Sequence, residues 1–86
     1  MKIRLYGIFK DVLGKEEIEV SLEEPVETGQ LLKRLAEKYK ELERLSHYIE
    51  NKGIKALIVA NGSIVNQGFL LNNNDYVIIL PPASGG

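Results

Sequence analysis

Hydrophobic and polar residues alternate over the first quarter of the chain. The odd positions from Ile3 to Phe9 carry Ile, Leu, Gly and Phe, and over residues 17–22 three apolar side chains alternate with glutamate and serine. A period of two is typical of a strand with one buried face. The pattern therefore predicts two strands. The short segment 10–15 between them, with Gly14, favours an antiparallel hairpin.

The period changes to that of a helix shortly after Thr28, whose hydroxyl is placed to cap the helix N-terminus. The charged residues that follow fall outside an apolar stripe, which predicts an amphipathic helix lying across a sheet. Leu45 and Ile49 extend the spacing into a second short helical segment, which Gly53 would end. The stripe consists of Leu31, Leu32, Leu35, Ala36, Tyr39 and Leu42.

The last third of the chain returns to extended patterns separated by turns. Residues 56–60 and 64–65 flank Asn61-Gly62, a dipeptide typical of a tight hairpin turn. Gly68 and the polar run 72–75 indicate further turns. Residues 76–80 are apolar at nearly every position, which suits a central strand covered on both sides.

This order of elements predicts an α+β fold in which a helix covers a sheet. If the last strand lies beside the first, an even number of chain reversals makes the two strands parallel. The result is the β-grasp, or ubiquitin-like, arrangement: a mixed sheet covered by one main helix. We place this domain at residues 1–80 and a flexible, extended Gly-Gly tail at residues 81–86.

Composition and charge exclude several kinds of function. The 86 residues include no cysteine and one histidine, His47, which leaves metal binding and histidine-based catalysis short of side chains. A net charge of −1 gives no general attraction to nucleic acid. The N-terminal residues lack a signal or transit pattern, and no apolar run reaches the ~20 residues of a membrane span. We expect a small cytoplasmic protein that binds no metal, nucleic acid or membrane.

The charged residues are unevenly distributed, because Asp75 is the sole charged side chain from Ala56 to Gly86. Late strands that are buried in a small sheet would explain this. A weakly charged surface for a partner, made of one sheet face and the tail, would explain it equally well. The sequence leaves both explanations open.

The chain ends in six residues of unusual composition, Pro81-Pro82-Ala83-Ser84-Gly85-Gly86. Proline fixes φ near about −65°, so the proline pair would aim the tail away from the sheet, and glycine passes through narrow spaces because it has no Cβ. Six extended residues reach at most roughly 20 Å, enough to enter a partner's active site. The terminal carboxyl is an anion at neutral pH and a poor electrophile, so it needs activation, most simply as an acyl-adenylate. The tail is therefore predicted to be a substrate for other enzymes.

With this tail on a β-grasp pattern, the sequence resembles the ubiquitin-like sulfur-carrier family, which includes MoaD, the small subunit of molybdopterin synthase, and ThiS, the carrier of the thiamine pathway. The likeness covers essentially the whole chain. It includes the first strand ending at Phe9, the loop closing at Gly14, the segment Ile58-Val59-Ala60-Asn61-Gly62 and the C-terminal tail. The proline pair makes the chain more similar to the MoaD branch than to ThiS.

The resemblance implies a carrier that is not an enzyme on its own and binds no cofactor. A ubiquitin-activating-type adenylyltransferase would use ATP to adenylate Gly86, and a sulfur donor protein would convert it to a thiocarboxylate. The large subunit of molybdopterin synthase would then receive the tail and pass its sulfur to a precursor pterin, on the way to a molybdenum or tungsten cofactor.

The resemblance also implies a role for each site residue. Gly86 bears the reactive atom, and Gly85 leaves it sterically accessible. Ser84 and Ala83 fit the partner's tunnel, Pro82 and Pro81 aim the tail, and Phe9 belongs to the partner-facing surface.

Two other functions stay open at this point. One is the same carrier chemistry for another purpose: thiamine synthesis, tRNA thiolation, or conjugation of the protein through Gly86 to lysines. The other is a β-grasp interaction module whose tail has no role.

Overall fold

Within residues 1–45 and 56–81, which the computed structural model describes, the strands form a five-stranded sheet and a two-stranded sheet. They are β1 (Lys2–Leu5), β2 (Glu17–Glu19), β3 (Val26–Glu27), β4 (Leu57–Ala60), β5 (Ser63–Ile64), β6 (Leu70–Leu71) and β7 (Tyr76–Leu80). The larger sheet has the order β2-β1-β7-β4-β5, and β3 pairs with β6 in the smaller one.

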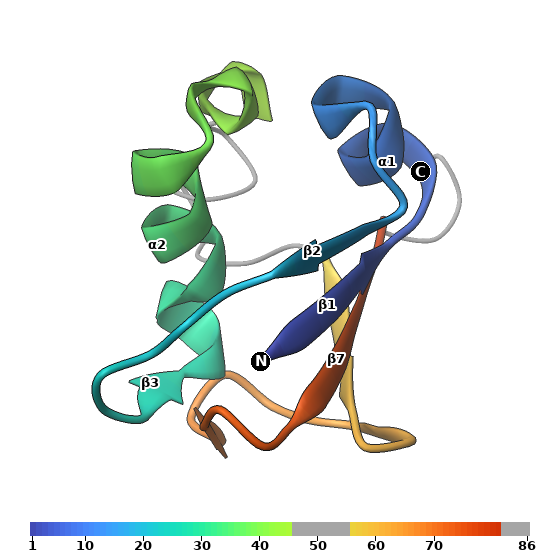
Figure 1. Cartoon of the computed structure of the whole chain (residues 1–86). Coiled ribbons are helices and arrows are strands. Elements are labelled where there is room, and N and C mark those ends of the chain that lie inside the picture. Colours follow the sequence, from blue (N-terminus) through green and yellow to red (C-terminus); the bar gives the residue numbers. More distant parts are fainter. Residues whose placement is uncertain (46–55, 82–86) are drawn as a thin grey trace.

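The last strand lies at the centre of the larger sheet (Figure 1). β7 runs parallel to β1, from Lys2 opposite Tyr76 to Leu5 opposite Ile79, and antiparallel to β4 on its other side. β1 also pairs antiparallel with β2. The prediction of parallel first and last strands is confirmed, and the fold is the β-grasp.

One face of the larger sheet is covered by α2 (Leu31–Lys38), with the 3-10 turns η1 (Thr28–Gln30) before it and η2 (Lys40–Leu45) after it (Figure 1). The apolar stripe packs against strand residues that are buried because they point to this side, among them Ile3, Val77 and Ile79. The predicted amphipathic helix is confirmed, and η2 is the predicted second helical segment. Ile49 and Gly53 lie outside the described residues. The buried stripe residues are Leu31, Leu32, Leu35 and Leu42.

The first strand is shorter than the sequence predicts. β1 ends at Leu5, and Gly7–Leu13 forms a helix, α1, that ends at Gly14, where φ is 70°. The alternation up to Phe9 was therefore misread, because Phe9 and the partly buried Val12 and Leu13 follow a helical spacing. The antiparallel pairing of the first two strands is confirmed, but a helix connects them in place of a hairpin loop.

The prediction that Thr28 caps the main helix is wrong. Thr28 is 1% exposed, and both its hydroxyl and its backbone N–H donate to the carbonyl of Phe69 at 2.9 Å. The hydroxyl is turned toward the chain beside β6, so Thr28 joins the end of β3 to a segment 41 residues later. α2 begins without a side-chain cap hydrogen bond.

The predicted Asn61-Gly62 hairpin turn is confirmed, with φ of 52° at Asn61 and 90° at Gly62. β7 is central as predicted, but it is not covered on both sides. Val77 and Ile79 are fully buried toward α2, while Tyr76 on the opposite face is 37% exposed. A single helical layer covers one face of the sheet and leaves the other accessible.

Candidate functional site

The tail follows β7, the central strand of the larger sheet. β7 has a hydrogen-bonded neighbour along both edges, and the N–H of Tyr6 donates to the carbonyl of Ile79 at 3.2 Å. Pro81 follows directly and is half-buried. The base of the tail is therefore held at a fixed place on the sheet.

Pro81 is the one predicted tail residue whose position the described ranges include. Pro82, Ala83, Ser84, Gly85 and Gly86 lie outside the described residues, so the roles expected for them stay predictions.

The predicted place of Phe9 on a partner-facing surface is wrong. Phe9 lies in α1 and is 1% exposed, within the core cluster formed with the strands and α2. Its neighbour Ile8, which is 38% exposed, lies on the outer side of the same helix turn. The surface role came from the resemblance alone, whereas the alternation of apolar odd positions already favoured burial of Phe9; in the structure α1 places it in the core.

An apolar surface covers the sheet on the side away from α2. The register places Arg4 opposite Ile78, Ile78 opposite Val59, and Val59 opposite Ile64, so these side chains form a row across four strands. A second row joins Leu80 to Leu57, and Tyr6 extends it past the end of β1. We call the following residues the open-face patch: Tyr6, Leu57, Val59, Ile64, Ile78 and Leu80.

The open-face patch is accessible and begins at the base of the tail. Tyr6 and Leu57 are each 40% exposed and Ile64 is 69% exposed. Leu80 belongs to the patch and is the residue immediately before Pro81. A partner that covers this patch would therefore lie beside the point from which the tail leaves the sheet.

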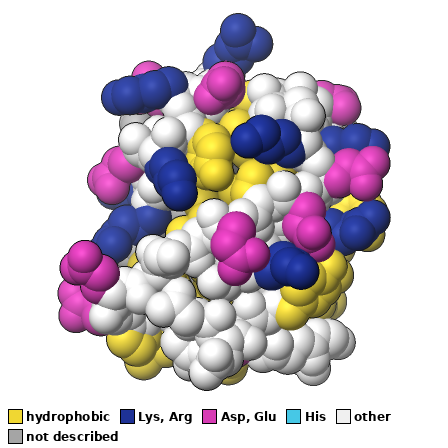
Figure 2. All heavy atoms as spheres, viewed as in Figure 1, with side chains coloured by type: hydrophobic (Ala, Val, Ile, Leu, Met, Phe, Trp, Pro, Cys, Tyr) yellow, Lys and Arg dark blue, Asp and Glu magenta, His cyan; other side chains and the backbone are white. Residues whose placement is uncertain are grey.

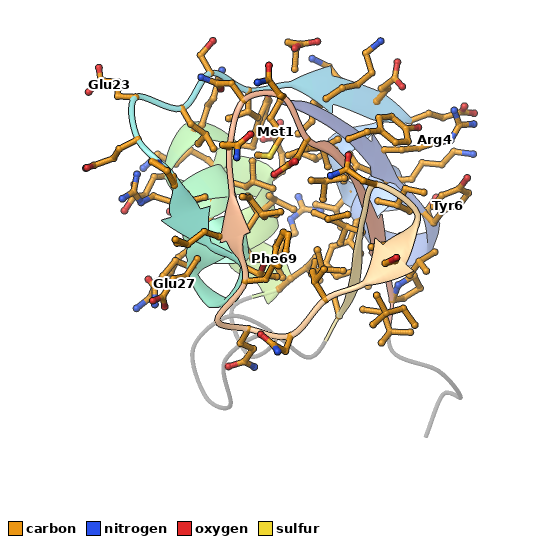
Figure 3. The ribbon with its side chains drawn as sticks, turned by 90° about the horizontal axis from the view of Figure 1, so that it is seen from below. Met1, Arg4, Tyr6, Glu23, Glu27 and Phe69 are labelled. Atoms are coloured by element: carbon orange, nitrogen blue, oxygen red, sulfur yellow. The ribbon has the colours of Figure 1, made fainter. Side chains whose placement is uncertain are left out.

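Arg4 supplies a cation at the border of the patch. Its guanidinium carbon lies 5.6 Å from the centre of the Tyr6 ring, within the range of a cation–π contact, and its Nη2 atom lies 3.6 Å from a carboxylate oxygen of Glu16. Figure 3 shows Arg4 and Tyr6 together on the side of the sheet away from α2. Hydrogen bonding to Tyr6, and to a lesser extent to Tyr76, raises the pKa of Arg4.

Burial explains part of the scarcity of charge after Ala56, and the sheet also has an accessible uncharged face; that a partner covers this face stays a prediction. Ile58 and Ala60 of β4 are buried in the core, whereas Leu57 of the same strand lies on the accessible face. By contrast, the face viewed in Figure 2 carries basic and acidic side chains side by side, with hydrophobic side chains visible between them.

The described ranges hold no assembled metal-binding group. In residues 1–45 and 56–81 no three His, Cys, Asp or Glu side chains come close enough to hold a metal ion. Every buried side-chain nitrogen or oxygen atom in these ranges has a hydrogen-bond partner. No helix in this part of the chain has the length and apolar character needed to cross a membrane.

A β-grasp domain with a central last strand and a sequence that ends in Gly-Gly has the architecture of the ubiquitin-like carriers and modifiers. The ThiS family model matches residues 3–86, so the chain belongs to the ThiS family.

Solved structures share the fold over almost the whole chain. SAMP1 from Haloferax volcanii has a TM-score of 0.77 at 24% identity, covering 100% of this chain and 98% of that one. A putative molybdopterin converting factor, subunit 1, from Pyrococcus furiosus has a TM-score of 0.73 at 23% identity and covers 95% of both chains. Small archaeal modifier protein 1 from Methanosarcina acetivorans has a TM-score of 0.70 at 27% identity, covering 99% of this chain and 94% of that one.

Proposed function

We propose that this protein is a cytoplasmic sulfur carrier whose Gly86 is adenylated and then thiocarboxylated, and that it serves as the small subunit of molybdopterin synthase. The observation that carries the proposal is the central position of β7, which leads from Leu80 directly into the tail. Membership of the ThiS family and the Pro-Pro-Ala-Ser-Gly-Gly ending support it.

The chemistry requires nothing of this chain except an accessible carboxyl. A carboxylate oxygen of Gly86 attacks the α-phosphorus of ATP in the activating enzyme, and pyrophosphate leaves. The terminal sulfur of a persulfide on a donor protein then attacks the acyl carbon and displaces AMP, which gives an acyl disulfide that joins the two proteins. A thiol reductant cleaves the S–S bond of this acyl disulfide, which releases the thiocarboxylate and the thiol of the donor. The thiocarboxylate sulfur is the nucleophile that reacts with the precursor pterin in the large subunit. Each catalytic group belongs to a partner.

In this scheme the open-face patch is the surface that partners hold. Interface centres are poor in charge and rich in aliphatic and aromatic side chains, as the patch is, and Arg4 lies at its border, where charged residues are common. A partner that binds this face anchors the domain beside the base of the tail, so the remaining residues reach its active site without a second docking surface. The activating enzyme and the large subunit would then bind the carrier one after the other.

A second candidate is a protein modifier, which uses the same first step and ends on a different acceptor. The likeness to small archaeal modifier protein 1 from Methanosarcina acetivorans favours it. In that function the activated Gly86 carboxyl would form an amide with a lysine of another protein, and AMP or a thiol would leave.

Intact-mass measurement tests the proposal and separates the candidates. The purified chain is incubated with ATP, the activating enzyme, a sulfur donor and a thiol reductant, and its mass should increase by the difference between sulfur and oxygen. Addition of the large subunit and the precursor pterin should then return the carrier to its starting mass and yield molybdopterin. A variant without Gly86 is the control and should not change mass. Lysine adducts on other proteins without pterin turnover would establish the modifier instead, and a chain that never gains sulfur would refute the carrier.

A further inference from the structure

The chain between β1 and α1 comes very close to the base of the tail. Gly7 is two residues beyond Leu5, which pairs with Ile79, so the parallel register brings it level with Pro81. A Cβ atom placed on Gly7 would lie 2.7 Å from Cγ, 3.2 Å from Cδ and 3.5 Å from Cβ of the Pro81 ring. The ring therefore occupies the space that any side chain at position 7 would need.

The backbone at this position also favours glycine. Gly7 has a φ of 59°, a conformation that allows the chain to leave β1 and enter α1 at once. β7 ends at Leu80, because Pro81 has no N–H with which to continue the ladder.

We propose that Gly7 is a positioning residue for the reactive end of the tail, an inference that rests on the proposed carrier function. Proline fixes its own φ, and the position of its ring against Gly7 fixes how the end of β7 is rotated. Together they set the direction in which the chain leaves the sheet. Because the open-face patch begins at Leu80, a partner bound to that patch receives the tail from a defined starting direction.

A side chain at position 7 would displace the Pro81 ring and redirect the tail without altering the open-face patch. Misplacing a reacting group costs rate when docking itself is unchanged. We therefore expect Gly7→Ala to lower kcat for adenylation by about tenfold or more and to change KM by less than about threefold. The rate is measured as ATP–pyrophosphate exchange by the activating enzyme at varied concentrations of the full-length carrier.

Gly14→Ala is a matched control. Gly14 has a similar φ of 70° at the other end of α1, but a Cβ atom there would have no neighbour within 4 Å. Both variants carry the same kind of backbone strain, so the difference between them isolates the contact with Pro81. Gly14→Ala should support exchange within about twofold of the wild type at temperatures where thermal melting shows each variant folded.

A rescue variant separates displacement of the ring from general damage to the fold. Pro81→Ala removes Cγ and Cδ and keeps Cβ, whose 3.5 Å distance is an ordinary contact. In the wild-type background Pro81→Ala should lower kcat, because the ring no longer fixes the end of β7. Added to Gly7→Ala, it should relieve the clash and raise kcat above that of Gly7→Ala alone, up to the level of Pro81→Ala but not to that of the wild type. Equal rates for Gly7→Ala and Gly14→Ala, or no recovery in the double variant, would overturn the inference.

Nuclear magnetic resonance of the free carrier makes the inference independent of the assay. The wild type should show an Overhauser contact between the Gly7 Hα atoms and the Pro81 ring, and Gly7→Ala should change the Cα shifts of residues 82 and 83 more than Gly14→Ala does. If the wild type is inactive in exchange, while the Overhauser contact and the shift changes of Gly7→Ala are observed, only the proposed function is contradicted. If the wild type is active, but the Overhauser contact and the shift changes of Gly7→Ala are not observed, only the positioning role of Gly7 is contradicted.

Discussion

The side-chain amide of Asn61 donates a hydrogen bond of 2.9 Å to the carboxylate of Asp75, and this contact joins the β4–β5 turn to the turn that precedes β7. The other carboxylate oxygen of Asp75 accepts from the backbone N–H of Asn72 at 2.9 Å. The Asn61 carbonyl oxygen accepts from the N–H of Tyr76, the first residue of β7. The two side chains thus fix the residue at which the central strand begins.

Replacing Asp75 with alanine should destabilise the protein by about 1 kcal/mol, because the two hydrogen bonds that hold the turns together are lost. Urea unfolding followed by circular dichroism measures the change. Asp11→Ala is the control, since Asp11 lies exposed in α1, and it should change stability by less than about 0.5 kcal/mol. Equal effects of the two substitutions would show that the turn contact contributes nothing.

Phe9→Ala should lower the free energy of unfolding by about 3–5 kcal/mol, because it removes a large side chain from the core. The adjacent Ile8→Ala, at a residue that is 38% exposed, should cost about 1 kcal/mol or less. Chemical denaturation of both variants gives the comparison. If Phe9→Ala changed the free energy of unfolding only slightly but weakened partner binding, Phe9 would belong to the partner-facing surface.

Ile64→Asp should weaken binding to the activating enzyme by about tenfold, since it places a charge on the β5 side of the open-face patch, opposite Val59. The fold should persist, because Ile64 is 69% exposed. Titration calorimetry or the KM for the carrier measures the effect.

Leu70→Asp is the matched control for the patch. Leu70 is also an exposed aliphatic residue in a two-residue strand, with 55% exposure, but it lies on β6 of the smaller sheet. Its substitution should leave the affinity within about twofold of the wild type. A larger loss from Leu70→Asp than from Ile64→Asp would move the docking surface to the smaller sheet.

One extra residue after Gly86 should abolish thiocarboxylate formation, because the terminal carboxylate would be displaced by about 3.5 Å from the α-phosphorus that it attacks. Gly85→Val should block adenylation through its β-branched side chain, and Gly85→Ala should reduce it less. Unfolding curves of all three variants should match the wild type. Normal molybdopterin formation by the extended chain would contradict the carrier chemistry.

Thr28→Asp should destabilise the protein by several kcal/mol, because it buries a carboxylate at a residue that is 1% exposed, next to the carbonyl of Phe69. Thr28→Val keeps the shape and should cost about 1 kcal/mol, since the backbone N–H of Thr28 still donates to the same carbonyl. Thermal unfolding measures both. A neutral Thr28→Asp would favour the helix-cap role that the sequence predicts, because aspartate is a good cap.

The sequence alone determined the main elements and the nature of the tail. The amphipathic stripe of α2, the Asn61-Gly62 turn and the apolar last strand each follow a local rule of periodicity or backbone conformation, so each is readable in a window of a few residues. The six C-terminal residues can also be recognised locally, because their small side chains and the terminal carboxyl are properties of the sequence itself.

Only the tertiary structure decided which residues are buried in the core and which residues distant in the sequence lie in contact. Phe9 fits a strand or a helix by local pattern, and its burial depends on the surface that α1 packs against. The local sequence suggests that Thr28 is a helix cap, but in the folded chain its hydroxyl donates to the carbonyl of Phe69. The open-face patch and the contact between Gly7 and Pro81 join residues from opposite ends of the chain. Such contacts are set by strand order and register, which depend on how the whole core packs and not on any local run of residues.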